Sequence, residues 1–77
     1  MTIEQRLRGQ KASADEKVRK AAMDVLSIAK ALKKLNDGHV WERQWNVLVK
    51  LHYKRNEEVW YEPTAIGSVF LKGLANN

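Results

Sequence analysis

The sequence SADEKVRKAAMDVLSIAKALKKLNDG, residues 13 to 38, carries the longest amphipathic pattern in the chain. Ser13 and Glu16 have the spacing of a capping box, and Asn36 to Gly38 supplies residues that typically end a helix. Apolar residues recur between these ends at spacings of three and four, as expected for a helix with one buried face. They are Val18, Ala21, Val25, Ile28, Leu32 and Leu35. We therefore predict a helix from about residue 14 to residue 35.

The segment before this helix, residues 1 to 11, is polar and basic. Thr2 and Gln5 have the spacing needed to cap a single helical turn. We interpret the segment as a flexible, conditionally helical basic arm, and residues 12 to 77 as one domain.

Residues 39 to 55 again fit a helical period, because Trp41, Trp45, Leu48 and His52 fall within one narrow arc. A strand through residues 47 to 49 is the less favoured alternative, since polar residues flank it and no hairpin turn follows. We therefore predict a second long helix that forms a hairpin with the first.

The segment Val59-Trp60-Tyr61 is expected to be short and extended, and Pro63 marks the start of a last helix that ends near Gly73. We expect Ile66, Val69 and Phe70 to pack against the tryptophans, and Gly67 to permit close approach of a neighbouring helix. The predicted fold class is all-α: a three-helix domain, with two long helices and a short C-terminal one, preceded by the basic arm.

Composition restricts the possible functions. The 77 residues include 14 Lys and Arg against 9 Asp and Glu, which gives a net charge of +5 and favours an anionic partner. The chain has no cysteine, no run of apolar residues long enough for a membrane span and no secretory signal pattern. A cytoplasmic protein without a membrane association is the expectation.

Catalysis is not expected. The two histidines, His39 and His52, stand thirteen residues apart, roughly 20 Å on a straight helix, so they cannot share a metal there. Glu57, Glu58 and Glu62 flank a turn, without a histidine or cysteine near them in the sequence, so we expect a solvated loop there. We predict no catalytic residues, cofactor, metal site or small-molecule substrate.

Basic side chains on helix faces make nucleic acid the leading candidate partner, because lysine and arginine neutralise phosphates. Plain solvation of charged helix faces is the alternative. At the start of the second helix, Arg43 and Gln44 are residue types that read base edges in a major groove. The candidate nucleic-acid-binding residues are Arg6, Arg8, Lys11, Arg19, Lys20, Lys30, Lys34, Arg43, Gln44, Lys50 and Lys54.

The aromatic residues suggest a second hypothesis. Trp60 and Tyr61 are adjacent in an extended segment, so their side chains should point to opposite sides. Tryptophan and tyrosine are frequent anchors of protein interfaces. The alternative function is therefore a protein-interaction module, an inhibitor or adaptor that docks Trp60 and Tyr61 or a basic face onto an acidic partner. A homodimer through the first helix is also possible.

Residues 62 to 70, EPTAIGSVF, resemble the second helix of helix-turn-helix and winged-helix transcription regulators, and residues 41 to 54 resemble the preceding helix. The resemblance covers about 30 residues and implies DNA binding and transcription regulation. The recognition helix of those families would follow Gly73, after which this sequence has four residues. A compact basic chain of this kind is also similar in style to accessory proteins of phages and plasmids. We therefore expect a small non-enzymatic regulator that binds duplex DNA.

Overall fold

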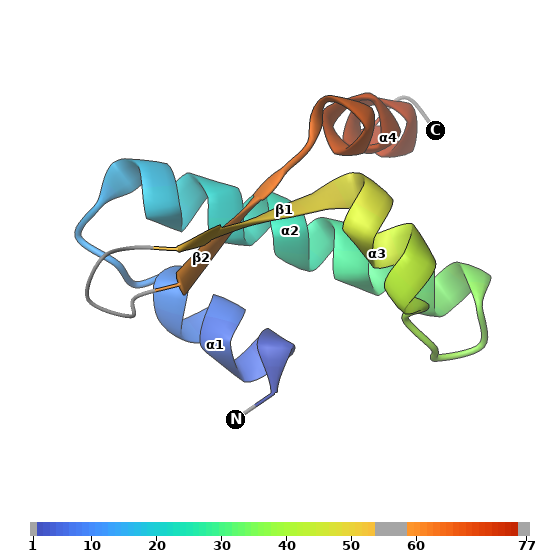
Figure 1. The fold of residues 1–77 in the computed structure, drawn as a ribbon, viewed down its shortest axis with the longest axis horizontal. Coiled ribbons are helices and arrows are strands. Elements are labelled where there is room, and N and C mark those ends of the chain that lie inside the picture. The colour runs from blue at the N-terminus through green and yellow to red at the C-terminus, as the bar shows by residue number, and fades with distance from the viewer. Residues whose placement is uncertain (1, 54–58, 76–77) are drawn as a thin grey trace.

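The computed structural model describes residues 2–53 and 59–75, which form helices and a two-stranded sheet (Figure 1). The long helix α2 lies at the centre, and the other elements pack against it or against each other. In chain order the elements are α1 (Ile3–Gln10), α2 (Glu16–Leu35), α3 (Glu42–Leu48), β1 (Val49–Tyr53), β2 (Val59–Pro63) and α4 (Ala65–Ala75).

The predicted all-α, three-helix fold is wrong. The described residues contain four helices and an antiparallel pair of strands. The helix expected over residues 39 to 55 ends at Leu48, and the chain continues directly as strand β1. Val49 and Leu51 alternate with Lys50 and His52, a pattern of period two that the helical arc of the tryptophans obscured. The less favoured alternative, a strand through residues 47 to 49, is also wrong in position, because residues 47 and 48 are helical and the strand runs from Val49 to Tyr53.

Strands β1 and β2 pair so that each face of the sheet has a distinct character. Leu51 lies opposite Tyr61, and Val49 lies opposite Pro63. On the other face, Lys50 lies opposite Glu62 and His52 lies opposite Trp60. Val49 and Tyr61 are buried, so the first face contributes to the core. The extended conformation predicted for residues 59 to 61 is confirmed.

Helix α2 ends at Leu35 as predicted, but it begins later than its sequence pattern indicated. Asp15 is the N-cap, and its carboxylate accepts a hydrogen bond from the amide of Lys17. Ser13 instead accepts a bond from the amide of Asp15, so it shapes the approach to the helix. Asp37 and Gly38 then turn the chain with positive φ angles of 55° and 90°.

The basic segment before α2 is helical and packed. Thr2 and Gln5 form the predicted capping box, with both reciprocal hydrogen bonds present. Leu7 is fully buried in the core, among residues of α2 and of the sheet. Residues 3 to 10 are therefore anchored to the domain as α1 in this structure.

Helix α4 is held against the end of α3. Thr64 donates its amide to the Leu48 carbonyl (3.0 Å) and its hydroxyl to the Val47 carbonyl (2.7 Å). The buried Gly67 lies directly on the Leu48 backbone, so the predicted close approach at Gly67 is confirmed.

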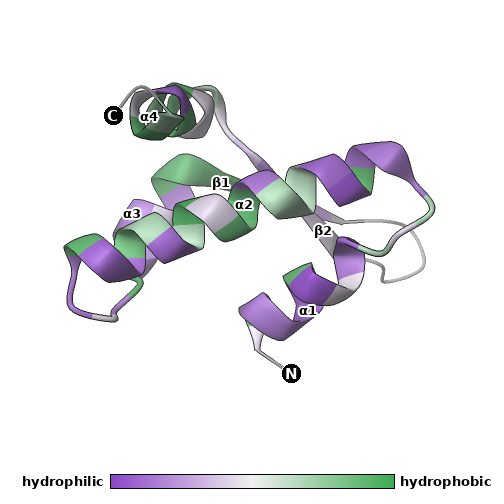
Figure 2. Ribbon diagram, turned by 180° about the vertical axis from the view of Figure 1, so that it is seen from behind, coloured by the Kyte–Doolittle hydropathy of each residue, from purple (hydrophilic) through white to green (hydrophobic). Residues whose placement is uncertain are grey.

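The expected packing of Ile66 and Val69 in the core is wrong, because both side chains are exposed. Gly67 takes the inward position, and Phe70 and Leu71 are the α4 side chains that pack on the core. The hydropathy colouring in Figure 2 accordingly shows apolar positions along α4, whereas α1 is mainly hydrophilic.

Candidate functional site

A group of cationic side chains meets where α1 lies along α2. Lys33 of α2 forms an ion pair with Glu4 of α1, and Arg8 reaches the other oxygen of the same carboxylate at 3.8 Å. Lys30, one turn before Lys33, acts on Glu4 through its charge. Three cations from two helices therefore surround a single carboxylate.

The pKa of Glu4 is lowered in this environment. The hydrogen bond from Lys33 lowers the pKa of Glu4, and the charges of Lys33, Arg8 and Lys30 lower it further. Partial desolvation acts in the opposite direction, but it is outweighed. Glu4 is therefore ionised at neutral pH and neutralises only part of the surrounding positive charge.

Helix geometry extends the group along α2. Lys34 lies one turn after Lys30, so the two ammonium groups share the exposed side of the helix. We call Arg8, Lys30, Lys33 and Lys34 the basic seam. Three of its four cations act on one carboxylate, that of Glu4, and a concentration of positive charge of this kind attracts polyanions.

The structure brings together only part of the predicted nucleic-acid-binding set. Arg6, Arg8 and Lys11 are exposed on α1 and at its C-terminal end, and Lys30 and Lys34 are exposed on α2. Near the start of α2, the half-buried Arg19 donates to the Ser13 carbonyl (3.3 Å) and Lys20 pairs with Glu16 (3.1 Å). Arg19 and Lys20 lie in the first turns of α2, about three helical turns before Lys30, and so are not part of the group around Glu4.

The predicted groove-reading residues have other positions. Gln44 of α3 accepts a hydrogen bond from the Asn36 side chain (2.7 Å), which links α3 to the end of α2. Arg43 lines an apolar groove, and Lys50 is exposed on β1 rather than on a helix. Lys54 lies outside the described residues.

Trp60 and Tyr61 do point to opposite faces of β2, as the alternation predicted. Tyr61 is buried and contacts Trp45 edge-on at 6.3 Å between ring centroids, so it is a core residue in this structure. Trp60 is half-buried on the outer face of the sheet, where the ring of His52 stacks on it at 4.3 Å. Lys17 lies 5.5 Å from the Trp60 ring centroid.

Among the described residues, His52 and Glu62 form the pair that most resembles the histidine–carboxylate pairs of acid–base catalysis. Nε2 of His52 lies 2.6 Å from a Glu62 carboxylate oxygen, and the stacked Trp60 holds the imidazole ring in place. No third histidine, aspartate or glutamate side chain joins them into a metal-binding group within residues 2–53 and 59–75. The observed contacts explain the pair as a cross-strand interaction that orders the outer sheet face.

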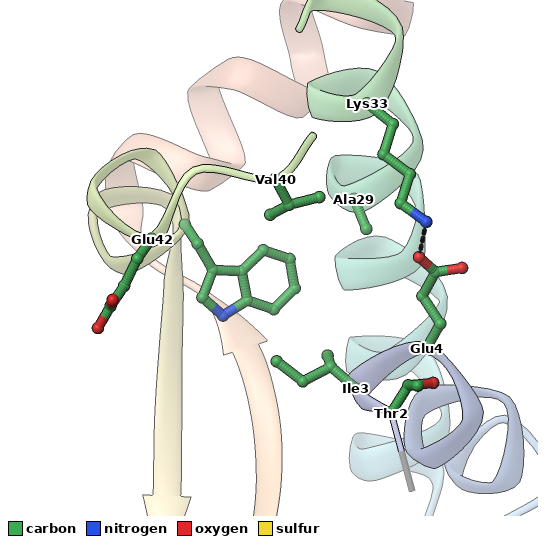
Figure 3. Close-up of a pocket in the computed structure, with 8 residues that line it drawn as sticks. Thr2, Ile3, Glu4, Ala29, Lys33, Val40 and Glu42 are labelled. Carbon is green, nitrogen blue, oxygen red and sulfur yellow. Dashed lines mark hydrogen bonds and ion pairs between the residues drawn. The ribbon is translucent and has the colours of Figure 1, made fainter. Parts of the chain in front are cut away.

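An apolar pocket of about 360 Å³ lies beside the basic seam, between α1, α2 and the start of α3 (Figure 3). Ile3, Ala29, Val40 and Trp45 supply its apolar surface. The ion pair of Lys33 and Glu4 stands at its margin, so these polar groups already satisfy each other. The pocket therefore presents mainly hydrophobic surface.

Lys33 is the member of the seam that the sequence interpretation did not include. It lies in the last turn of α2, where a cation also interacts favourably with the helix dipole. The pairing with Glu4 spans 29 residues of sequence and depends on how α1 docks. A pattern of residues close together in the sequence cannot reveal this contact.

No known protein family, curated protein or solved structure matches this chain. In the described part of the chain, no helix combines the length and apolar character needed to span a membrane.

Proposed function

We propose that this protein is a small non-enzymatic regulator that binds duplex DNA through the basic seam. The observation that supports the proposal is the convergence of Arg8, Lys30 and Lys33 on the single carboxylate of Glu4, with Lys34 beside them. Cations on two neighbouring helices can contact successive phosphates without reading bases. The resemblance of residues 62 to 70 to helix-turn-helix regulators favours the same class of partner, and the cytoplasm is the proposed compartment.

The seam predicts a measurable dependence on salt. Each neutralised phosphate contributes about −0.9 to the slope of log K against log salt, so four contacts give a slope of about −3.6. Fluorescence anisotropy with a labelled duplex of about 20 base pairs, titrated between 50 and 200 mM NaCl, measures this slope.

Two double variants with the same loss of charge separate the seam from net charge. Lys30→Ala with Lys34→Ala removes two seam cations and should reduce the magnitude of the slope by about 1.8. Lys50→Ala with Lys72→Ala removes two exposed cations from β1 and α4 and should leave it unchanged. Equal weakening by both double variants, or no binding of the wild type at 50 mM NaCl, would contradict the proposal.

A change at Glu4 provides a test in which the affinity for DNA should rise and not fall. Glu4→Gln removes the negative charge inside the seam and releases Lys33, so the affinity for DNA should rise. Asp37→Asn makes the same change of charge in the turn after α2, at a positive φ that asparagine tolerates. A larger gain for Asp37→Asn than for Glu4→Gln would argue against the seam.

A further inference from the structure

Helix α4 leaves an apolar ridge uncovered. Ile66 and Val69, one turn apart, are 59% and 69% exposed, while Gly67 and the partly buried Phe70 and Leu71 face the protein. Gly73, one turn after Val69, has no neighbouring atom within 4 Å of the position of a Cβ, so the surface stays open there. Exposed apolar side chains in such a row are typical of surfaces that bind a partner.

A groove of about 290 Å³ lies beside this ridge, between the end of α2, α3 and α4. Leu35 and Val47 on its walls are 69% and 48% exposed. Phe70 lines the groove and stands one turn after Ile66, so ridge and groove form one continuous surface. We call it the α4 surface. Its groove residues are Leu32, Leu35, Arg43, Gln44, Val47, Leu48 and Phe70.

The charges of the α4 surface are positive. Among the described residues that line the groove, Arg43 is the one with a charge. On α4, Lys72 follows Val69 by three residues and so borders the ridge on the side away from the groove. On that side, Asp24 of α2 lines the same cleft as Lys72. An occupant with acidic groups flanking an apolar stripe complements this arrangement.

We propose that the α4 surface docks a single amphipathic helix of a partner protein whose polar face is acidic. Recognition would follow the helix-in-groove mode, with apolar side chains spaced at i, i+3 or i+4 and i+7 entering beside Phe70 and Val47. Carboxylates flanking that stripe would meet Arg43 and Lys72. A second copy of this chain fits less well, because it brings another net charge of +5 and a second Arg43 to the same surface.

The position of α4 prepares this surface for binding. The hydrogen bonds of Thr64 to Val47 and Leu48, and the contact of Gly67 with the Leu48 backbone, fix α4 relative to α3. The groove walls therefore need little rearrangement when a helix enters, which reduces the entropic cost of binding. This inference concerns residues other than those of the basic seam and does not depend on DNA binding.

Two synthetic peptides test the proposal on the full-length chain. Both carry leucines at the same i, i+3 and i+7 spacing over about 16 residues, roughly 24 Å of helix, with Glu at the flanking positions of one and Lys in the other. Anisotropy of the labelled peptides should give a dissociation constant about tenfold lower for the acidic peptide. Equal affinities, or no saturable binding of the acidic peptide, would overturn the proposal.

Matched variants locate the site. Val69→Gln should weaken acidic-peptide binding about tenfold, whereas Met23→Gln, which also replaces an exposed apolar side chain with a polar one, at a 52% exposed position of α2, should not. Arg43→Gln should remove most of the preference for the acidic peptide, and Lys50→Gln should retain it. Unchanged binding by Val69→Gln, with circular dichroism showing a folded protein, would refute the assigned surface. Light scattering that shows a dimer lost in Val69→Gln would assign the surface to a second copy and also refute it.

Discussion

Replacement of Gly67 by alanine should destabilise this protein, although alanine is the better helix former. Within a helix the change normally gains about 1 kcal/mol. At Gly67, however, a Cβ would lie 3.0 Å from the carbonyl carbon of Leu48, 3.3 Å from Cβ of Pro63, and well inside the contact radius of the Leu48 carbonyl oxygen. The obstacle is backbone, so a side-chain rotation cannot relieve it, and α4 must move away from α3.

The cost of this movement can be worked out from the contacts that it disturbs. Thr64 loses its hydrogen bonds to Val47 and Leu48, each worth about 1 kcal/mol net. Overpacking typically adds about 1 to 3 kcal/mol. After subtraction of the gain in helix propensity, the free energy of unfolding should fall by about 2 to 4 kcal/mol. A domain of this size has only about 4 to 12 kcal/mol in total.

Gly73→Ala is the matched control, because it makes the same change in the same helix where nothing lies within 4 Å of the new atom. That variant should be stabilised by up to about 1 kcal/mol. Urea denaturation followed by tryptophan fluorescence measures both, and with an m-value near 1 kcal/mol/M the midpoint for Gly67→Ala should fall by about 2 to 4 M. A midpoint for Gly67→Ala equal to or above that of the wild type would show that α4 does not rest on the Leu48 backbone.

Three further predictions address other parts of the fold. Leu7→Ala should cost about 2 to 5 kcal/mol in the same assay, because Leu7 is fully buried; an unchanged midpoint would mean that α1 is not part of the core. Thr64→Val should cost about 1 to 2 kcal/mol, since it removes the hydroxyl that bonds Val47 and receives an amide of α4; a loss within error would contradict that role. The pKa of Glu4 is lowered by folding, so its contribution is present at neutral pH and is lost as the pH falls through the lowered pKa. Glu4→Gln should therefore melt below the wild type at pH 7 and together with it near pH 2, and a gap that persists in acid would refute the assignment.

The features best predicted from the sequence are those that depend on the residues of one helix or strand alone. The three-four spacing and the residues of the terminal turn predicted most of α2, and the Pro63-Thr64 step predicted the beginning of α4 to within two residues. Alternation along residues 59 to 61 also placed Trp60 and Tyr61 on opposite faces. These features depend on local backbone geometry, and the spacing of apolar and polar residues along the chain reflects that geometry directly.

The change from helix to strand after Leu48 was not predictable in the same way. Trp41, Trp45, Leu48 and His52 fit a helical arc, but pairing with residues 59 to 63 gives the second half of that segment hydrogen bonds in a strand. The basic seam was not predictable for the same reason, because Arg8 and Lys33 come together at Glu4 only when the burial of Leu7 docks α1 against the domain. Tertiary contacts decide both outcomes.

The direct passage from α3 into β1 restricts how the length of this chain can vary. Leu48 is the last residue of the helix and Val49 is the first of the strand, so the phase of the alternation in β1 is set by the end of α3. One residue inserted at this junction would turn β1 over, moving Val49 to the surface and Lys50 inward. Substitutions are therefore far easier to accommodate here than insertions or deletions. Among related sequences, differences in length should be absent near residue 48 and should occur instead at sites such as the turn at Asp37 and Gly38.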